Sequence, residues 1–420
     1  MSLPQNIAAV SVSPTVGSSL HDAFARRRTV EPAPSSLRAP RVLHPLENEG
    51  LRLLILENIS QEAVNTFRSQ GYHVDHYTKA LSEDELVQKI GSYHGIGIRS
   101  KTKITAKVLK AASKLLVIGC FCIGTNQAGV PVFNSPFSNS RSVAELVMSE
   151  LVSLSRQLFD RAYELKTGIW NKQSKNCWEI RGKTLGIVGY GHIGSQLSAR
   201  QTETLEALLA EADFVTLHVP ELPETIKMIS TEQLSKMKTW FLPHQQRSRQ
   251  AIKSKHIAGA AIDVFPHEPG ANGDPFDDQL NPWASELRKL PNVILTPHIG
   301  GSTEEAQAMI GQEVSQYLSR YLGYGSTMGA VNFPEVDLRA IAAGQENQMR
   351  VCHIHRNQPG VLKQVNDALS PYNVEKQYSD SKGEIAYVMA DIADVNAAEL
   401  TALKQRISST DANILTRFLT

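Results

Sequence analysis

The chain has few cysteines, no excess of charge and no long apolar run, and each absence excludes a class of protein. Its four cysteines include no Cys-x-x-Cys pair and are too few for a disulfide framework, which favours a reduced, cytoplasmic protein. Forty-three basic residues stand against 42 acidic ones, and a net charge of +1 gives no reason to expect nucleic acid or a membrane surface as a partner. No uncharged run is long enough to cross a bilayer. No residue pattern predicts a metal site.

What is present is an ordinary globular composition with one unusual end. The 420 residues, 41% of them hydrophobic, suffice for two to three domains. Residues 1–50 are instead rich in Ser, Pro and Ala, and we expect them to be disordered because they bury too little apolar surface to fold. Prolines and acidic residues in this segment disfavour a transit peptide, so a solvated tail is the preferred interpretation.

A parallel sheet is expected from Leu51 onward. Short apolar strands alternate there with helices, a pattern typical of βαβ units, and Ser82 with Glu85 forms a capping box that opens one helix. Ligands of such sheets bind beyond the carboxyl ends of the strands, where Arg99 and Ser100 lie. A cation at this place suits a small anionic substrate, but Arg99 is equally compatible with a surface ion pair.

A long helix from Ser142 to Leu165 is expected to join this sheet to a second one. Ser142 and Glu145 form another capping box, and the apolar residues that follow keep helical spacing. We interpret the apolar stripe as core.

The second sheet begins with the stretch Lys183-Thr-Leu-Gly-Ile-Val-Gly-Tyr-Gly-His-Ile-Gly194. Its pattern is that of a strand that turns through Gly189, Gly191 and Gly194 into a helix. In a dinucleotide site the first glycine permits the tight turn, the second lets backbone approach a pyrophosphate, and the third lets helix pack on strand. The anion then lies on free N–H groups at the helix N-terminus.

The segment after this glycine fingerprint departs from a dinucleotide fold. Such a fold needs a second strand that ends in an acidic residue about 20 residues downstream. Ser195 to Ala212 instead has the pattern of one continuous helix, and Asp213 precedes the next strand, so we interpret Asp213 as a helix-end residue. Trp240 to Arg249 has no clear periodicity and does not resemble a buried strand.

Two later strand ends carry groups suited to acid–base chemistry. Ile257 to Asp263 and Asn292 to His298 have strand patterns, and Glu268 follows the first of them. His298 and Glu268 make a plausible general base and its orienting partner, although a lone histidine at a strand end is as often structural.

Residues 348–420 have the pattern of a compact βαββαβ unit. A small α+β module of this kind usually regulates or oligomerises.

Five segments together resemble the D-2-hydroxyacid dehydrogenases, and within that family the members that oxidise 3-phosphoglycerate. The match runs from about Leu51 to the C-terminus, and residues 348–420 resemble the ACT domain that binds serine in the family. The five segments are Ile118–Gln127, Asn134–Leu146, the glycine fingerprint, Ala260–Pro269 and Thr296–Gly301.

The resemblance implies an α/β fold with two Rossmann-like parallel-sheet domains and a C-terminal α+β ACT domain. Residues 51–145 and 299–330 would form a discontinuous substrate-binding domain around an internally shortened NAD-binding domain of residues 146–298. The ACT domain would cover residues 348–420, with a disordered extension at 1–50.

The resemblance also implies NAD-dependent oxidation of 3-phosphoglycerate to 3-phosphohydroxypyruvate, the first step of L-serine biosynthesis. His298 would take the proton of the C2 hydroxyl, and Glu268 would hold His298. Serine would inhibit through the ACT domain, and a homotetramer is expected. The implied ligand-binding residues are Gly189, Gly191, His192, Ile193, Gly194, Asp263, His298, Ile299, Gly300 and Gly301 for NAD; Arg99, Ser100 and Asn134 for the substrate; and His355, Asn357 and Asn373 for serine.

Two parts of the family pattern are missing. The family carries a catalytic arginine in a segment that Thr239–Arg249 replaces here, and neither Arg247 nor Arg249 matches its motif. The ribose-binding acid and its strand are absent after Leu197, and a shorter gap follows Gln127. The alternative hypothesis is therefore a catalytically impaired relative, or a truncated gene model, that acts as a serine-binding or oligomerising partner.

Overall fold

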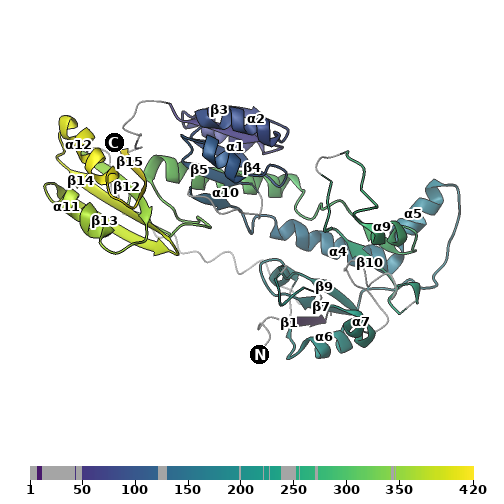
Figure 1. Cartoon of the computed structure of the whole chain (residues 1–420). Helices are drawn as coiled ribbons and strands as arrows, with labels where there is room; N and C mark the ends of the chain where they lie inside the picture. Colours follow the sequence, from purple (N-terminus) through teal and green to yellow (C-terminus); the bar gives the residue numbers. More distant parts are fainter. Residues whose placement is uncertain are drawn as a thin grey trace, which may run out of the picture. The chain divides into compact units, whose positions relative to one another are not determined.

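In the computed structural model the chain folds into two compact units. The first unit comprises Met1–Arg28 and Phe137–Ala306, and the second comprises Thr29–Pro136 and Gln307–Thr420. Figure 1 shows the helices and strands of both units. The residues that the structure describes are 7–11, 43, 50–121, 130–197, 200–220, 222–226, 228–237, 252–254, 256–269, 273–341, 345 and 347–420.

The second unit contains a parallel sheet, which confirms the βαβ pattern expected from Leu51. Its strands lie in the order β3-β2-β4-β5-β6, and every neighbouring pair is parallel. Apolar residues on one face pack against α1 and α10, and those on the other face pack against α2 and α3. The predicted capping box of Ser82 and Glu85 is present at the start of α2. The elements are β2 (Arg52–Leu56), α1 (Gln61–Ser69), β3 (His73–Tyr77), α2 (Glu83–Lys89), β4 (Gly95–Ile98), α3 (Ala106–Ala111), β5 (Val117–Cys120), β6 (Val132–Asn134) and α10 (Glu304–Tyr324).

The C-terminal residues of the second unit form the predicted βαββαβ module. Its antiparallel sheet has the order β13-β14-β12-β15, and α11 and α12 pack on one face of it (Figure 1). The other face joins the core that contains the end of α10, where Arg350 and Asp391 form a fully buried ion pair at 2.7 Å. The elements are β12 (Gln348–Arg356), α11 (Val361–Leu369), β13 (Asn373–Lys382), β14 (Ile385–Ala393), α12 (Ala397–Ser408) and β15 (Asn413–Leu419).

The first unit contains the glycine fingerprint and a sheet in two parts. Strands β7 and β9 pair in parallel, as do β10 and β11, but β9 and β10 do not pair within the described residues. Trp240–Arg249, the stretch that did not resemble a buried strand, lies outside the described residues. The elements are α4 (Ser140–Arg156), α5 (Leu158–Lys166), β7 (Thr184–Val188), η2 (Gly194–Leu197), β8 (Arg200–Gln201), α6 (Leu205–Glu211), β9 (Phe214–Leu217), α7 (Thr231–Lys236), β10 (Ala260–Ile262), α9 (Pro282–Leu287) and β11 (Val293–Leu295).

The single helix predicted from Ser142 to Leu165 is wrong in two respects. Gln157 adopts a left-handed backbone conformation with φ of 49°, so the segment forms two helices, α4 and α5. The turn is held because the backbone N–H of Trp178 donates to the carbonyl of Ser155 at 2.8 Å. The predicted capping box is also absent, since α4 begins after Asn139, which makes no side-chain cap.

The predicted helix from Ser195 to Ala212 is wrong as well. The chain makes only the 3₁₀ turn η2, then the short strand β8, and then α6, whose N-cap is the Thr204 side chain. Apolar residues keep helical spacing within α6, which is the correct part of the prediction. The predicted helix began too early, at the glycine fingerprint.

The expectation of disorder for the whole of residues 1–50 is wrong at two places. Ile7–Ser11 form β1, which pairs antiparallel with β7, and Leu43 is buried in the core of the second unit. The run Ile7-Ala-Ala-Val-Ser11 is short and apolar, so the average composition of the segment conceals it. The strand forms beside β7 because the edge of a sheet accepts an extended segment that supplies backbone partners.

Candidate active site

The structure brings together the two residues predicted to carry acid–base chemistry. His298 Nδ1 lies 2.9 Å from Glu268 Oε1 and 3.0 Å from Oε2. His298 follows β11, and Glu268 lies in the loop after β10, where its carboxylate also accepts the backbone N–H of Phe265 at 3.1 Å. With Nδ1 donating to the carboxylate, Nε2 is the nitrogen left to take a proton from a substrate. The side chain of His298 is 54% exposed, so a substrate can reach it.

Asp263 holds the loop on both sides of His298. Its carboxylate accepts hydrogen bonds from Thr296 Oγ1 at 2.7 Å and from the backbone N–H groups of Ile299 and Gly300 at 2.7 and 2.8 Å. His298 itself has a φ of 53°, a conformation that costs a non-glycine residue about 1–3 kcal/mol and that survives only where the surroundings enforce it. The carboxylate of Asp263 provides that enforcement.

The loop after His298 also packs closely on the N-terminus of α4. A Cβ atom on Gly301 would lie 2.7 Å from Asn139 Nδ2, so this position has no room for a side chain. Ser142 Oγ and Thr303 Oγ1 lie 2.8 Å apart and form a further contact between the two segments. The predicted nicotinamide-side residues Asp263 and His298 to Gly301 therefore form one connected group.

The glycine fingerprint has the backbone geometry that a pyrophosphate site needs. Gly189 has a φ of 99°, and a Cβ there would lie 2.5 Å from the carbonyl oxygen of His218. A Cβ on Gly194 would lie 2.3 Å from the carbonyl oxygen of Gly189, whereas one on Gly191 would meet nothing within 4 Å. The first and third glycines thus close the turn, and the second faces open space where a phosphate fits. The residues present fit this half of NAD.

The predicted pyrophosphate residues His192 and Ile193 lie in this turn. The His192 ring stacks on Phe137 with the ring centroids 3.4 Å apart. The fingerprint is followed by only one 3₁₀ turn, η2, so the helix N-terminus expected to hold the anion is shortened.

The adenosine half fits less well. Asp213 is a structural residue, as expected, because its carboxylate accepts the backbone N–H of Thr184 at 2.8 Å, at the start of β7 and away from the fingerprint turn. The place beside β7, where a dinucleotide-binding fold has a parallel strand that leads to a ribose-binding acid, holds β1, which runs in the opposite direction. Within the described residues, no acid ends a parallel strand next to β7.

The predicted substrate residues lie at the carboxyl edge of the parallel sheet in the second unit. Arg99 and Ser100 follow β4, and Asn134 is the buried last residue of β6. The Arg99 guanidinium donates to the carbonyl oxygen of Asn58 at 3.0 Å.

Glu57 organises this edge and was missed in the sequence analysis. Its buried carboxylate accepts the backbone N–H groups of Arg99, Lys101 and Thr102 at 3.0, 3.2 and 2.9 Å. Glu57 directly follows β2, the strand next to β4. An acid at the end of a buried strand was the available signal.

The predicted serine-binding residues do not meet within one chain. His355 pairs across the sheet with Ala386, and Asn373 with Ala393, so the two lie at opposite ends of β14. Asn357 lies near His355 in sequence and donates to the carbonyl oxygen of Gly383 at 3.2 Å. His355 is buried, and its Nε2 has no hydrogen-bond partner in the structure.

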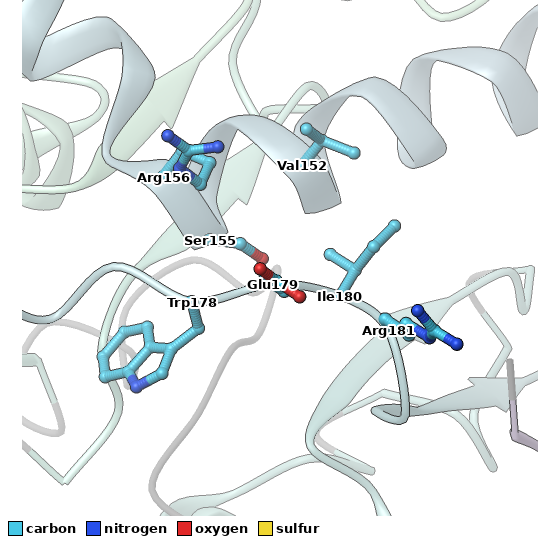
Figure 2. A pocket seen from close by; sticks show the side chains of 7 residues that line it. All are labelled: Val152, Ser155, Arg156, Trp178, Glu179, Ile180 and Arg181. Atoms are coloured by element: carbon cyan, nitrogen blue, oxygen red, sulfur yellow. The ribbon is translucent and has the colours of Figure 1, made fainter. Parts of the chain in front are cut away.

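A pocket of about 250 Å³ is lined by none of these groups (Figure 2). One wall is the end of α4 and the other is the segment that leads into β7. The lining residues are Val152, Ser155, Arg156, Trp178, Glu179, Ile180 and Arg181. None of them is a predicted site residue, so this pocket is not the candidate active site.

The described part of the chain has no cluster of His, Cys, Asp and Glu that could hold a metal ion. Among the same residues, no helix has the length and apolar character needed to cross a membrane.

Comparison with known proteins identifies the class to which this fold and site belong. The family described as D-isomer specific 2-hydroxyacid dehydrogenase, catalytic domain, matches residues 53–332. The chain belongs to this family of NAD-dependent oxidoreductases. D-3-phosphoglycerate dehydrogenase 2 of Saccharomyces cerevisiae is 50% identical over 452 residues, covering 98% of this chain and 95% of that protein. D-3-phosphoglycerate dehydrogenase of Escherichia coli strain K12 is 42% identical, covering 86% of this chain and 96% of that protein.

Solved structures agree on the fold. The NAD complexed form of the D-isomer specific 2-hydroxyacid dehydrogenase from Lactobacillus delbrueckii ssp. bulgaricus superposes with a TM-score of 0.55, at 22% identity, over 65% of this chain and 98% of that one. The alignment with the yeast relative is longer than the 420 residues of this chain, so that relative has residues with no counterpart here.

Proposed function

We propose that the chain oxidises 3-phosphoglycerate to 3-phosphohydroxypyruvate with NAD, the first step of L-serine biosynthesis. The observation that carries this proposal is the His298–Glu268 pair at 2.9 Å, in a chain half identical to a protein named for that substrate. A cytoplasmic location belongs to the same proposal, and it is supported by the free thiols of Cys120, Cys177 and Cys352.

The reaction needs one proton acceptor and one hydride acceptor. His298 Nε2 takes the proton of the C2 hydroxyl as the C2–O bond becomes a carbonyl, and the Glu268 carboxylate stabilises the imidazolium that forms. NAD, held at the glycine fingerprint and beside Asp263, would supply the acceptor for the hydride of C2. Asp263 keeps His298 in its unusual backbone conformation throughout.

The substrate carries two anionic groups, and the second unit offers donors for them. Arg99, Ser100 and Asn134 share the carboxyl edge of one sheet, where a small anion is expected to bind. The family's catalytic arginine has no assigned counterpart, and Arg247 and Arg249 lie outside the described residues.

A second candidate function is favoured by the broken sheet. The first unit lacks a strand between β9 and β10 within the described residues, and a central strand supplies both neighbours with backbone hydrogen bonds. On this candidate the chain, or the gene model that encodes it, has lost activity and keeps its C-terminal module as a serine-binding or oligomerising partner.

One pair of measurements separates the two candidates. NADH formation that depends on 3-phosphoglycerate, and that disappears in His298→Asn, supports the dehydrogenase. Serine binding by calorimetry without any NADH formation supports the second candidate. Sequencing the transcript across the junctions after Gln127, Leu197 and Lys238 tests whether the gene model is truncated, because restored segments would return the missing strands.

The proposal extends to serine as an effector bound between two chains. Because His355 and Asn373 lie at opposite ends of β14, a second copy in the reverse orientation is needed to bring one to the other. The edge strand β13 leaves its outer backbone groups available for such pairing. Asn373→Ala is expected to abolish serine binding, and an unchanged affinity would reject this site.

A homotetramer needs a second contact surface, and α5 with the residues after it supplies one. Six large apolar side chains there are at least half exposed, with Trp170 at 79%. They are Leu158, Phe159, Tyr163, Leu165, Ile169 and Trp170. Two different symmetric surfaces are what a tetramer with D2 symmetry requires. Sedimentation of Phe159→Glu should show dimers in place of tetramers.

A further inference from the structure

Phe137 is an aromatic residue that contacts the glycine fingerprint and has no part in the mechanism proposed above. It lies two residues before Asn139, which precedes α4, and its side chain is 51% exposed. Its ring stacks on the ring of His192 with an interplanar angle of 12° and the centroids 3.4 Å apart. A phenylalanine that leaves half of its surface in water contributes little to a core, so its main contact is the one with His192.

The start of α4 is a fixed support for Phe137. The carbonyl oxygen of Phe137 accepts the backbone N–H of Ser140 at 3.0 Å, which ties Phe137 to the first turn of this helix. Asn139 packs so closely on the loop after His298 that a Cβ atom on Gly301 would lie 2.7 Å from its Nδ2. Phe137 therefore belongs to a segment that is already held in place on the nicotinamide side of the cofactor site.

The stack leaves the edge of the His192 ring available to a ligand. It covers one face of the imidazole, whereas both ring nitrogens lie on the edge and make no hydrogen bond to another described residue. An imidazole carries at least one N–H, and a phosphate oxygen is an acceptor for it. Gly191, the preceding residue, faces open space, since a Cβ there would meet nothing within 4 Å. The backbone of the turn and the ring edge of His192 can thus serve the same anion.

We propose that Phe137 is a positioning residue for the pyrophosphate of NAD, because its stack on His192 holds the glycine turn ready to receive the anion. A side chain that is fixed before binding loses less conformational freedom when the ligand arrives. Without the stack, the ligand itself has to order the His192 ring. The proposal rests on the NAD-dependent function proposed above and adds a residue outside the fingerprint to its cofactor site.

The test compares two substitutions of Phe137 by cofactor binding alone, without substrate. Phe137→Leu keeps an apolar side chain but cannot stack, whereas Phe137→Tyr keeps the ring. Dissociation constants are measured on the full chain for NADH, by nicotinamide fluorescence, and for ADP-ribose, which has the pyrophosphate but no nicotinamide, by calorimetry. Phe137→Leu should weaken the binding of both ligands about fivefold, as for the loss of one aromatic pair, and Phe137→Tyr should bind as the parent chain does.

A double-mutant cycle separates the stack from a general effect on the fold. His192→Asn should itself weaken both ligands, and Phe137→Leu should add no further loss in that background. Leu280→Ala, a similarly exposed apolar side chain in the same unit, is the matched control and should leave both constants unchanged.

Equal affinity of the parent chain and Phe137→Leu would overturn the proposal, as would an undiminished loss in the His192→Asn background or no binding of either ligand by the parent chain. Binding of NADH without phosphoglycerate-dependent turnover would count only against the dehydrogenase function. Turnover with unchanged cofactor affinity in Phe137→Leu would count only against the role given to Phe137.

Discussion

Asp263 accepts the backbone N–H of Ile299 at 2.7 Å, directly beyond a histidine whose φ is 53°. The same carboxylate accepts the hydroxyl of Thr296, so it is bonded on both sides of His298. The Glu268 contact sets the ring of His298, while Asp263 sets its backbone. Two acids from the loop that follows β10 thus orient the general base together.

Asp263→Asn should weaken this arrangement without removing a residue that contacts the substrate. An amide keeps one acceptor oxygen for three donors, and each lost charged hydrogen bond is worth about 1.5–3 kcal/mol. We expect kcat to fall about 10²-fold as His298 moves from its working position, since a misplacement of about 1 Å has that effect. Asp278→Asn, an exposed residue paired with Arg288, is the control and should leave kcat unchanged. A fall in stability with full kcat would contradict the role given to Asp263.

Glu268→Gln should leave the imidazole in place but deprive it of a counter-charge. The imidazolium formed during proton transfer then lacks the carboxylate at 2.9 Å, and we expect kcat to fall by about 10²–10⁴, the range for general acid–base groups. The Michaelis constant for 3-phosphoglycerate should change little. His267→Asn, next to it in the same loop and exposed, should retain full activity. Equal losses in both variants would point to damage of the loop instead of the chemistry.

Much of the fold was predictable because its signals are local. The βαβ pattern after Leu51, the C-terminal βαββαβ module and the Ser82 capping box all follow from spacing and turn residues within short windows. Glu268 and His298 are 30 residues apart in sequence, yet both follow parallel strands, and strands of one sheet end at the same edge.

The failures have a common physical origin in tertiary contacts. The apolar spacing continues through Gln157, yet the helix ends there. The backbone N–H of Trp178, far along the chain, donates to the Ser155 carbonyl in the last turn of α4. Ile7–Ser11 form a strand by pairing with β7, which lies far along the chain. In both cases a partner far along the chain decides the local structure, so a short window of sequence does not predict it.

Glu57→Gln should act on substrate binding through the loop that carries Arg99. The buried carboxylate accepts the backbone N–H groups of Arg99, Lys101 and Thr102, and a neutral amide would leave at least one of them unpaired. We expect the free energy of unfolding to fall by about 2–4 kcal/mol and the Michaelis constant to rise about tenfold, with a smaller change in kcat. Both are measured on the purified chain, by urea unfolding and by steady-state kinetics. Glu62→Gln, exposed on α1, should change neither quantity.

The buried side chain of His353 should make the free energy of unfolding depend on pH in the acidic range. It is fully buried in β12, with Nδ1 2.9 Å from Thr416 Oγ1, and burial, followed by the nearby His355, lowers its pKa to about 4. Between its ordinary pKa of about 6.5 and this value, the unfolded chain binds a proton that the folded chain does not. Stability is therefore lost as the pH falls through that window, by a few kcal/mol, since one pKa unit is worth about 1.4 kcal/mol.

His353→Gln should remove this loss, because glutamine does not titrate and can still bond Thr416. Urea unfolding at intervals between about pH 7 and about pH 4 should give a flatter stability profile for the variant than for the parent chain. His218, whose pKa burial also lowers to about 4, destabilises both proteins equally in acid and cancels in the comparison. The exposed His267→Gln should keep the parent slope. Parallel profiles for the parent and His353→Gln would mean that His353, although stacked on His355, is protonated in the folded chain.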